Sequence, residues 1–239
     1  KKVTKKAAKK VVKQAKAKRK KRAVKCPLTS RELKEFRKLL DKGYAYQGDN
    51  GDIFYSVSRF EGYGQLSGKR IEDLRSGARV DVEEAKRDPL DFVLWKAAKP
   101  GEPSWPSPWD DGRPGWHIEC SAMSMKYLGD TFDIHTGGED HIAIHHENEI
   151  AQNMGSCNCG GARYWLHTNM LLLNGKKMSK SDGNNVTPDE LFTGDSPHLT
   201  KSYSPMAIRF FMLQAHYRST LDLSDESLQG AEKGYRRLM

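Results

Sequence analysis

Strand-like and helix-like segments alternate through the middle of the chain, and this alternation constrains the fold more than any other feature of the sequence. In chain order they are a helix at residues 116–128, a strand at 132–135, a helix at 144–154 and strands at 164–166 and 170–173. The first strand runs into Thr136-Gly137-Gly138. Strands that alternate with helices predict an α/β fold with a parallel sheet.

The regions on either side of residues 116–173 show weaker patterns of secondary structure. The predicted elements there are a helix that is capped at Thr29 or Ser30 and ends at Gly43, strands at 44–46, 53–55 and 92–95, a helix at 205–214 and a last helix from about Ser227. Asp49-Asn50-Gly51-Asp52 predicts a hairpin turn between the first two of these strands. Residues 99–115 hold five of the ten prolines and predict an irregular linker at a domain boundary.

The basic charge is concentrated at one end of the chain. Residues 1–25 contain 14 Lys and Arg and no acidic residue, whereas residues 26–239 carry 26 basic and 31 acidic residues, a net charge of about −5. This basic arm predicts contact with a polyanion such as RNA. A solvated tail and an organelle presequence are the alternatives, although Ser is absent from the arm and Arg is scarce.

Composition excludes several classes of protein. No apolar run approaches the ~18 residues that a membrane helix needs, and no signal-peptide core is present. The four cysteines, at positions 26, 120, 157 and 159, are too few for a disulfide scaffold in 239 residues. We therefore expect a reducing, cytoplasmic setting and no membrane partner.

Cys120, His145 and Glu149 form the first candidate site. His145 and Glu149 are four residues apart, so a helix places both side chains on one face. Thiolate, imidazole and carboxylate are three ligand types of tetrahedral zinc sites. Spacing alone is weak evidence, because i, i+4 His/Glu pairs are also common on solvated helices.

Lys177-Met178-Ser179-Lys180-Ser181 forms the second candidate site, directly after a strand and Asn174-Gly175. Two lysines in a small, polar loop can reach a triphosphate and match the charge that develops on pyrophosphate. The alternative for an arbitrary pair of lysines is a basic surface loop.

These segments together resemble cysteinyl-tRNA synthetase, a class I aminoacyl-tRNA synthetase. Lys177 to Ser181 is similar to the KMSKS loop of the class, and Gly115 to Met123 to the segment with the zinc-binding cysteine. The other matching strings, which place the resemblance across residues 31–239, are Gly77–Val82, Asp91–Lys96, Glu102–Trp109, Phe132–His135, His145–Gln152 and His216–Ser219.

The resemblance implies a Rossmann-type catalytic fold and a set of site residues. Cys120, His145 and Glu149 match the zinc ligands, and Trp116 and His135 match residues of the cysteine and adenylate pocket. The loop implies Lys177 and Lys180 as catalytic residues, with Met178, Ser179 and Lys180 at ATP. The neighbouring histidines are expected to pack or hydrogen-bond rather than to bind metal: His117, His141, His146 and His167.

The resemblance also implies partners and domains. Zn²⁺ would be the cofactor, ATP with Mg²⁺, cysteine and tRNA(Cys) the substrates, and cysteinyl-adenylate the intermediate. Zinc prefers thiolate to hydroxyl, which would separate cysteine from serine. The implied segments are a basic arm at 1–30, a connective insertion at 31–110, the second half of the catalytic domain at 111–173, and the KMSKS loop with a helical stem-contact region at 174–239.

Departures from the family leave alternatives open. The 239 residues contain no HIGH string, and the family's first catalytic half, with its own zinc-binding cysteine, is expected before residue 31. The helical anticodon-binding region is expected after Met239. The chain alone is therefore expected to be a poor catalyst. The rivals are a cysteine–amino sugar ligase of the same family and a non-catalytic RNA-binding remnant.

The resemblance assigns no role to the other three cysteines. Cys26 is a weak candidate for a fourth zinc ligand, because its Cys-Pro-Leu context is unlike that of the family. Cys157 and Cys159 are expected to be free thiols in a loop, with a second metal site as the alternative.

Overall fold

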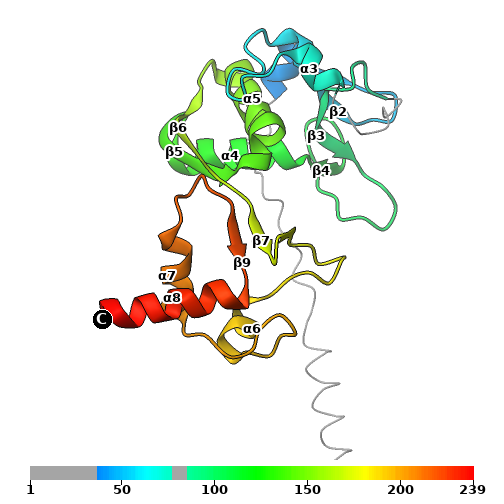
Figure 1. The fold of residues 1–239 in the computed structure, drawn as a ribbon. Helices are drawn as coiled ribbons and strands as arrows, with labels where there is room; N and C mark the ends of the chain where they lie inside the picture. Colours follow the sequence, from blue (N-terminus) through cyan, green and yellow to red (C-terminus); the bar gives the residue numbers. More distant parts are fainter. Residues whose placement is uncertain (1–36, 77–84) are drawn as a thin grey trace, which may run out of the picture.

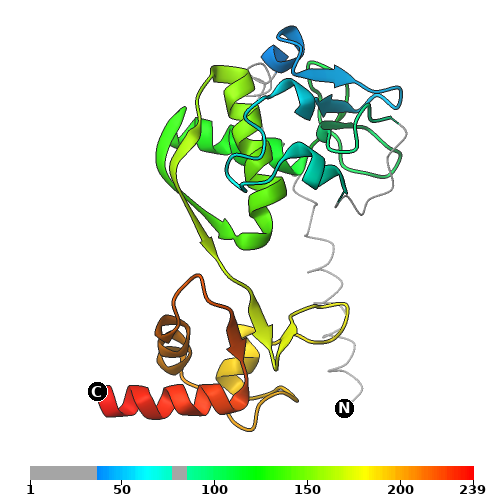
Figure 2. The same cartoon turned by 45° about the horizontal axis from the view of Figure 1, so that its top comes forward.

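The computed structural model describes residues 37–76 and 85–239, which form two lobes (Figures 1 and 2). The larger lobe contains an antiparallel sheet, a pair of parallel strands and the two central helices. The smaller lobe contains the C-terminal strands and helices, and the chain crosses from β6 in the larger lobe to β7 in the smaller lobe. The basic arm, Cys26, the start of the first predicted helix and the string at 77–82 lie outside the described residues.

The larger lobe begins with a four-stranded antiparallel sheet in the order β1-β2-β3-β4. Its strands are β1 (Ala45–Gln47), β2 (Ile53–Tyr55), β3 (Phe92–Ala97) and β4 (Gly112–Pro114). The predicted hairpin is confirmed, since Ala45 pairs with Tyr55 and Gln47 with Ile53. The short elements between β2 and β3 are η1 (Val57–Arg59) and α3 (Ile71–Ser76).

Strand β4 lies inside the predicted irregular segment and was not predicted. It pairs with β3 through Trp95 and Pro114. A proline is tolerated here because β4 is an edge strand of the sheet. Gly112 is required at its position, since a Cβ there would lie 2.2 Å from the carbonyl oxygen of Lys96.

A β-α-β unit follows the sheet, as predicted. The helix α4 (Trp116–Leu128) precedes the unit, whose elements are β5 (Thr131–Gly138), α5 (Glu147–Cys157) and β6 (Gly161–Thr168). Strands β5 and β6 are parallel and in register from Thr131–Gly161 to Gly138–Thr168. Parallel neighbours need a crossover connection, which α5 supplies here. This pairing confirms the predicted α/β class with a parallel sheet.

The predicted helix at 144–154 differs from the structure at both ends. A 3₁₀ turn (Glu139–His141) and a π-helical turn (Ile142–His146) precede α5. At the other end, Asn158 adopts a left-handed conformation with φ of 59°. The chain reverses there and brings Cys157 and Cys159 into a disulfide, so the expectation of two free loop thiols was wrong.

The smaller lobe is built on the sheet β8-β7-β9. Its elements are β7 (Leu171–Leu173), β8 (Lys176–Lys177), α6 (Pro188–Thr193), α7 (Pro205–Gln214), β9 (Leu221–Leu223) and α8 (Asp225–Leu238). The structure confirms α7 to the residue, because Ser204 caps it and Pro205 occupies its first turn. The last helix begins two residues before the predicted Ser227, after a cap at Ser224.

Two hydrophobic clusters stabilise the lobes. The first joins side chains of the antiparallel sheet, such as Leu94 and Trp95, to Ile118 and Ala122 of α4 and Ala151 of α5. The second lies in the smaller lobe around Leu173, Phe211 and Leu228. The first cluster therefore contains residues from both sides of position 110, where the boundary was predicted; the division into domains stays a prediction. No helix of the described residues is long and apolar enough to span a membrane.

Candidate metal and adenylate site

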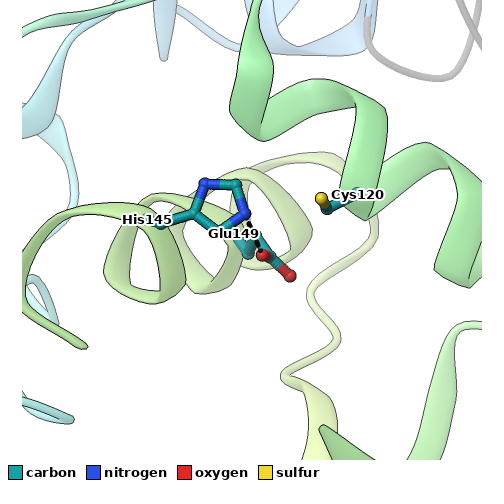
Figure 3. Close-up of side chains that lie close together, drawn as sticks. All are labelled: Cys120, His145 and Glu149. Carbon is teal, nitrogen blue, oxygen red and sulfur yellow. Dashed lines mark ion pairs between the residues drawn. The ribbon is translucent and has the colours of Figure 1, made fainter. Parts of the chain in front are cut away.

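Three side chains of the first candidate site meet between α4 and α5 (Figure 3). Cys120 lies in the second turn of α4, His145 in the π-helical turn and Glu149 in the first turn of α5. One ligand atom from each lies within 4.8 Å of the others. The Nε2 atom of His145 lies 2.9 Å from Oε1 of Glu149. The three donors thus converge on one point that a metal ion could occupy.

The polar atoms of this group are poorly satisfied by the protein itself. Oε1 of Glu149 is buried and, within residues 37–76 and 85–239, accepts no hydrogen bond, although Nε2 of His145 lies 2.9 Å away. Burial, and then the charges of Glu149 and Glu119, raise the pKa of the Cys120 thiol to about 11. A cation at this point would satisfy the carboxylate and favour the thiolate.

His117 supports the group from the side of α4. Its Nδ1 atom lies 2.8 Å from Nδ1 of His145, and both rings are buried. Burial, and then the neighbouring His145, lower the pKa of His117 to about 3, so this ring is neutral at physiological pH. The expectation that His117 hydrogen-bonds rather than binds metal agrees with this contact.

Trp116 and His135 border the same group, where the resemblance placed a pocket. The Trp116 ring stacks on His145 at 4.2 Å and 27°, yet 55% of the tryptophan remains exposed. From β5, Nε2 of His135 lies 3.5 Å from Oε2 of Glu149. Each oxygen of Glu149 therefore faces a different histidine.

A second possible ligand group was not predicted. His135, His146 and Glu149 also offer ligand atoms within 4.8 Å of one another. However, Nδ1 of His146 already lies 2.8 Å from Nε2 of His167. Burial is the largest cause that lowers the pKa of His146 to about 3, followed by His135 and His167. The adjacent pair His145-His146 was the sequence signal for this group.

The helix that carries Glu149 is fixed by its neighbours. Glu147 is fully buried and accepts backbone hydrogen bonds from Gly64 and Ser67. Asn148 accepts a 2.6 Å hydrogen bond from the Tyr63 hydroxyl. A buried carboxylate with two such bonds holds α5 firmly against the 63–67 loop.

The second candidate site lies in the smaller lobe. Lys177 ends β8, Lys180 is exposed, and Met178 packs against the second hydrophobic cluster. Ser179 pairs with Asn184, which closes the loop. Among the described residues, no hydrogen bond or ion pair links this loop to the Cys120 group.

The charge of Lys177 in this loop nevertheless affects Asp140 in the larger lobe. The pKa of Asp140 is lowered chiefly by its hydrogen bond with His141, and Lys177 adds a smaller contribution. His141 in turn makes an edge contact with Trp116 at 5.4 Å. Lys177 therefore lies close enough to Asp140 for its charge to stabilise that carboxylate.

Comparison with known proteins gives a consistent result. The family model described as tRNA synthetases class I (C) catalytic domain matches residues 1–233. A cysteine–tRNA ligase of Thioalkalivibrio sulfidiphilus is 56% identical over 200 residues, 84% of this chain and 42% of the relative. One of Thermococcus onnurineus is 55% identical over 202 residues, 84% of this chain and 40% of the relative. The chain spans about two fifths of the length of these curated relatives.

Proposed function

Because the chain belongs to the family of class I (C) tRNA synthetase catalytic domains, we propose that it supplies the amino-acid site and the ATP loop of a cysteine–tRNA ligase. The observation that carries this proposal is the convergence of Cys120, His145 and Glu149 within 4.8 Å. The names of the relatives, at 53–56% identity, favour this function over the cysteine–amino sugar ligase.

We propose zinc as the metal at Cys120, His145 and Glu149. The donors are one sulfur, one imidazole nitrogen and one carboxylate, a set that suits zinc and leaves a fourth position open. Oε1 of Glu149 is buried and accepts no hydrogen bond from the described residues, which fits a metal ligand. Zinc bound there would supply affinity for the soft thiolate of cysteine over the hydroxyl of serine.

The remaining chemistry is positioning and charge stabilisation. In the first step the cysteine carboxylate attacks the α-phosphorus of ATP, and pyrophosphate leaves. We assign Lys177 and Lys180 to the phosphates, where two exposed ammonium groups can match the growing negative charge. Met178 anchors this loop through its apolar contacts, and the Ser179–Asn184 pairing shapes it.

Trp116 and His135 would border the cysteine and its adenylate. The exposed face of Trp116 offers an apolar wall beside His145. In the second step the terminal ribose hydroxyl of tRNA(Cys) attacks the adenylate carbonyl, and AMP leaves. Transfer needs alignment of the two reactants more than it needs a covalent enzyme intermediate.

Selective binding of cysteine tests the proposed function. Calorimetric titration of the zinc-loaded chain should show cysteine binding at least ~10² more tightly than serine, because a site built for one substrate group rejects the analogue that lacks it. Removal of zinc with a chelator should abolish the preference. Equal affinity for the two amino acids, or a preference that survives metal removal, would contradict the proposal.

Catalysis by the 239-residue chain should be slow. The chain contains no HIGH string, and the loss of a transition-state hydrogen-bond donor typically costs ~10²–10³ in rate. Cysteine-dependent exchange of pyrophosphate into ATP should therefore fall at least ~10² below that of an enzyme with the motif. Serine serves as the background control. Exchange at the rate of the motif-containing enzyme would show the expectation to be wrong.

A further inference from the structure

The short contact between His117 and His145 requires one ring to donate a hydrogen bond and the other to accept it. Their Nδ1 atoms lie 2.8 Å apart in a buried environment. A hydrogen bond between two imidazole nitrogens requires one proton between them, with one ring as donor and the other as acceptor. Two protonated nitrogens would repel each other, and two bare nitrogens would make no bond.

The position of the other nitrogen of His145 decides which ring donates. Nε2 of His145 faces Oε1 of Glu149 at 2.9 Å and belongs to the group with Cys120. When a metal binds this atom, Nε2 must present a lone pair, so the proton of the neutral ring lies on Nδ1. In that state His145 donates to His117, and Nδ1 of His117 accepts.

His117 is buried between aromatic neighbours that hold its ring beside His145. Its ring makes an edge contact with Phe92 at 5.3 Å and 81°, and lies against Trp116 at 5.6 Å and 26°. His117 and Cys120 are three residues apart on α4, which places them on one side of the helix. One helix thus carries both a candidate ligand and the group that orients its neighbour.

We propose that His117 is a positioning residue that fixes His145 in the tautomer with Nε2 free for the metal. This inference rests on the proposed metal site and extends it beyond the three ligands. Groups that orient a metal-binding histidine typically contribute 10–100-fold to metal affinity.

Two substitutions at one position separate the hydrogen bond from packing. His117→Asn keeps an acceptor near the place of Nδ1, whereas His117→Leu keeps apolar bulk and removes the acceptor. Competition with a zinc indicator should show ~10–100-fold weaker zinc binding for His117→Leu, but a loss below about threefold for His117→Asn, which retains the acceptor. His167→Leu is the matched control, because it breaks a His–His contact of the same length that does not involve His145.

The tautomer can be read in the zinc-loaded chain. In its ¹⁵N spectrum, His117 should carry its proton on Nε2 and leave Nδ1 as the acceptor for the Nδ1–H group of His145. A proton on Nδ1 of His117, or equal zinc affinity for His117→Leu and the unsubstituted chain, would overturn the inference. Failure of the unsubstituted chain to bind zinc would instead contradict the proposed metal site on which the inference rests.

Discussion

Replacement of Cys120 by alanine should reduce bound zinc from about one ion per chain to almost none. The substitution removes the soft, anionic donor of a three-residue set, and the remaining imidazole and carboxylate are weak ligands on their own. Metal analysis after dialysis at a fixed free zinc concentration measures the effect.

The chain offers a matched control for this loss. Simultaneous substitution of Cys157 and Cys159 by alanine removes two sulfurs from the end of α5 and should leave the zinc content unchanged. Zinc retained by Cys120→Ala, or lost from the double variant, would contradict the assignment of the ligands.

Zinc binding should also weaken as the pH falls. Burial, with Glu149 and Glu119, raises the pKa of the Cys120 thiol to about 11, so the metal-free group is protonated at neutral pH. Binding to the thiolate must release this proton. The apparent affinity, measured by competition with a zinc indicator, should therefore fall by about tenfold for each pH unit between pH 9 and 7.5. An affinity that stays constant over this range would contradict binding to the Cys120 thiolate.

RNA affinity should be strongly salt-dependent and should depend on residues 1–25. The reason is the charge division, with 14 basic residues in the arm and a net charge of about −5 in the rest. If the arm contacts about six phosphates of single-stranded RNA, log K should fall with log salt at a slope of about −4. A fourfold rise in salt would then weaken binding by ~10².

Titrations of two RNAs at two salt concentrations measure this effect. A labelled tRNA and an unrelated RNA should bind the intact chain alike, since the arm has no aromatic residue for base stacking. A chain that lacks residues 1–25 should bind both weakly. Equal affinity with and without the arm would support the alternative of a solvated tail.

Local signals explain which elements were predictable. Both α4 and α7 match their predicted bounds, because flanking residues mark their ends: Gly115 and Gly129 for α4, Ser204 for α7. Strand β4 has no such signal, since its Gly-Arg-Pro sequence becomes a strand only by pairing with β3. The disulfide depends on the left-handed turn at Asn158, which no periodicity reveals.

Only part of the candidate site could be predicted from local sequence; the rest depends on contacts between distant segments. The i, i+4 relation of His145 and Glu149 is local, and the structure keeps both on one side even though a π-helical turn intervenes. The approach of His135 to Glu149 and of His117 to His145 depends on how β5 and α4 pack around α5. These are contacts between distant segments, so residue types alone could not assign roles to the two histidines.

X-ray absorption at the zinc edge tests the central claim most directly, because it counts the sulfur atoms bound to the metal. The zinc-loaded chain should show one sulfur neighbour at about 2.3 Å, from Cys120. Saturation with cysteine should add a second sulfur at a similar distance, and serine should add none. A spectrum that cysteine leaves unchanged would contradict recognition of the substrate thiol by the metal at Cys120, His145 and Glu149.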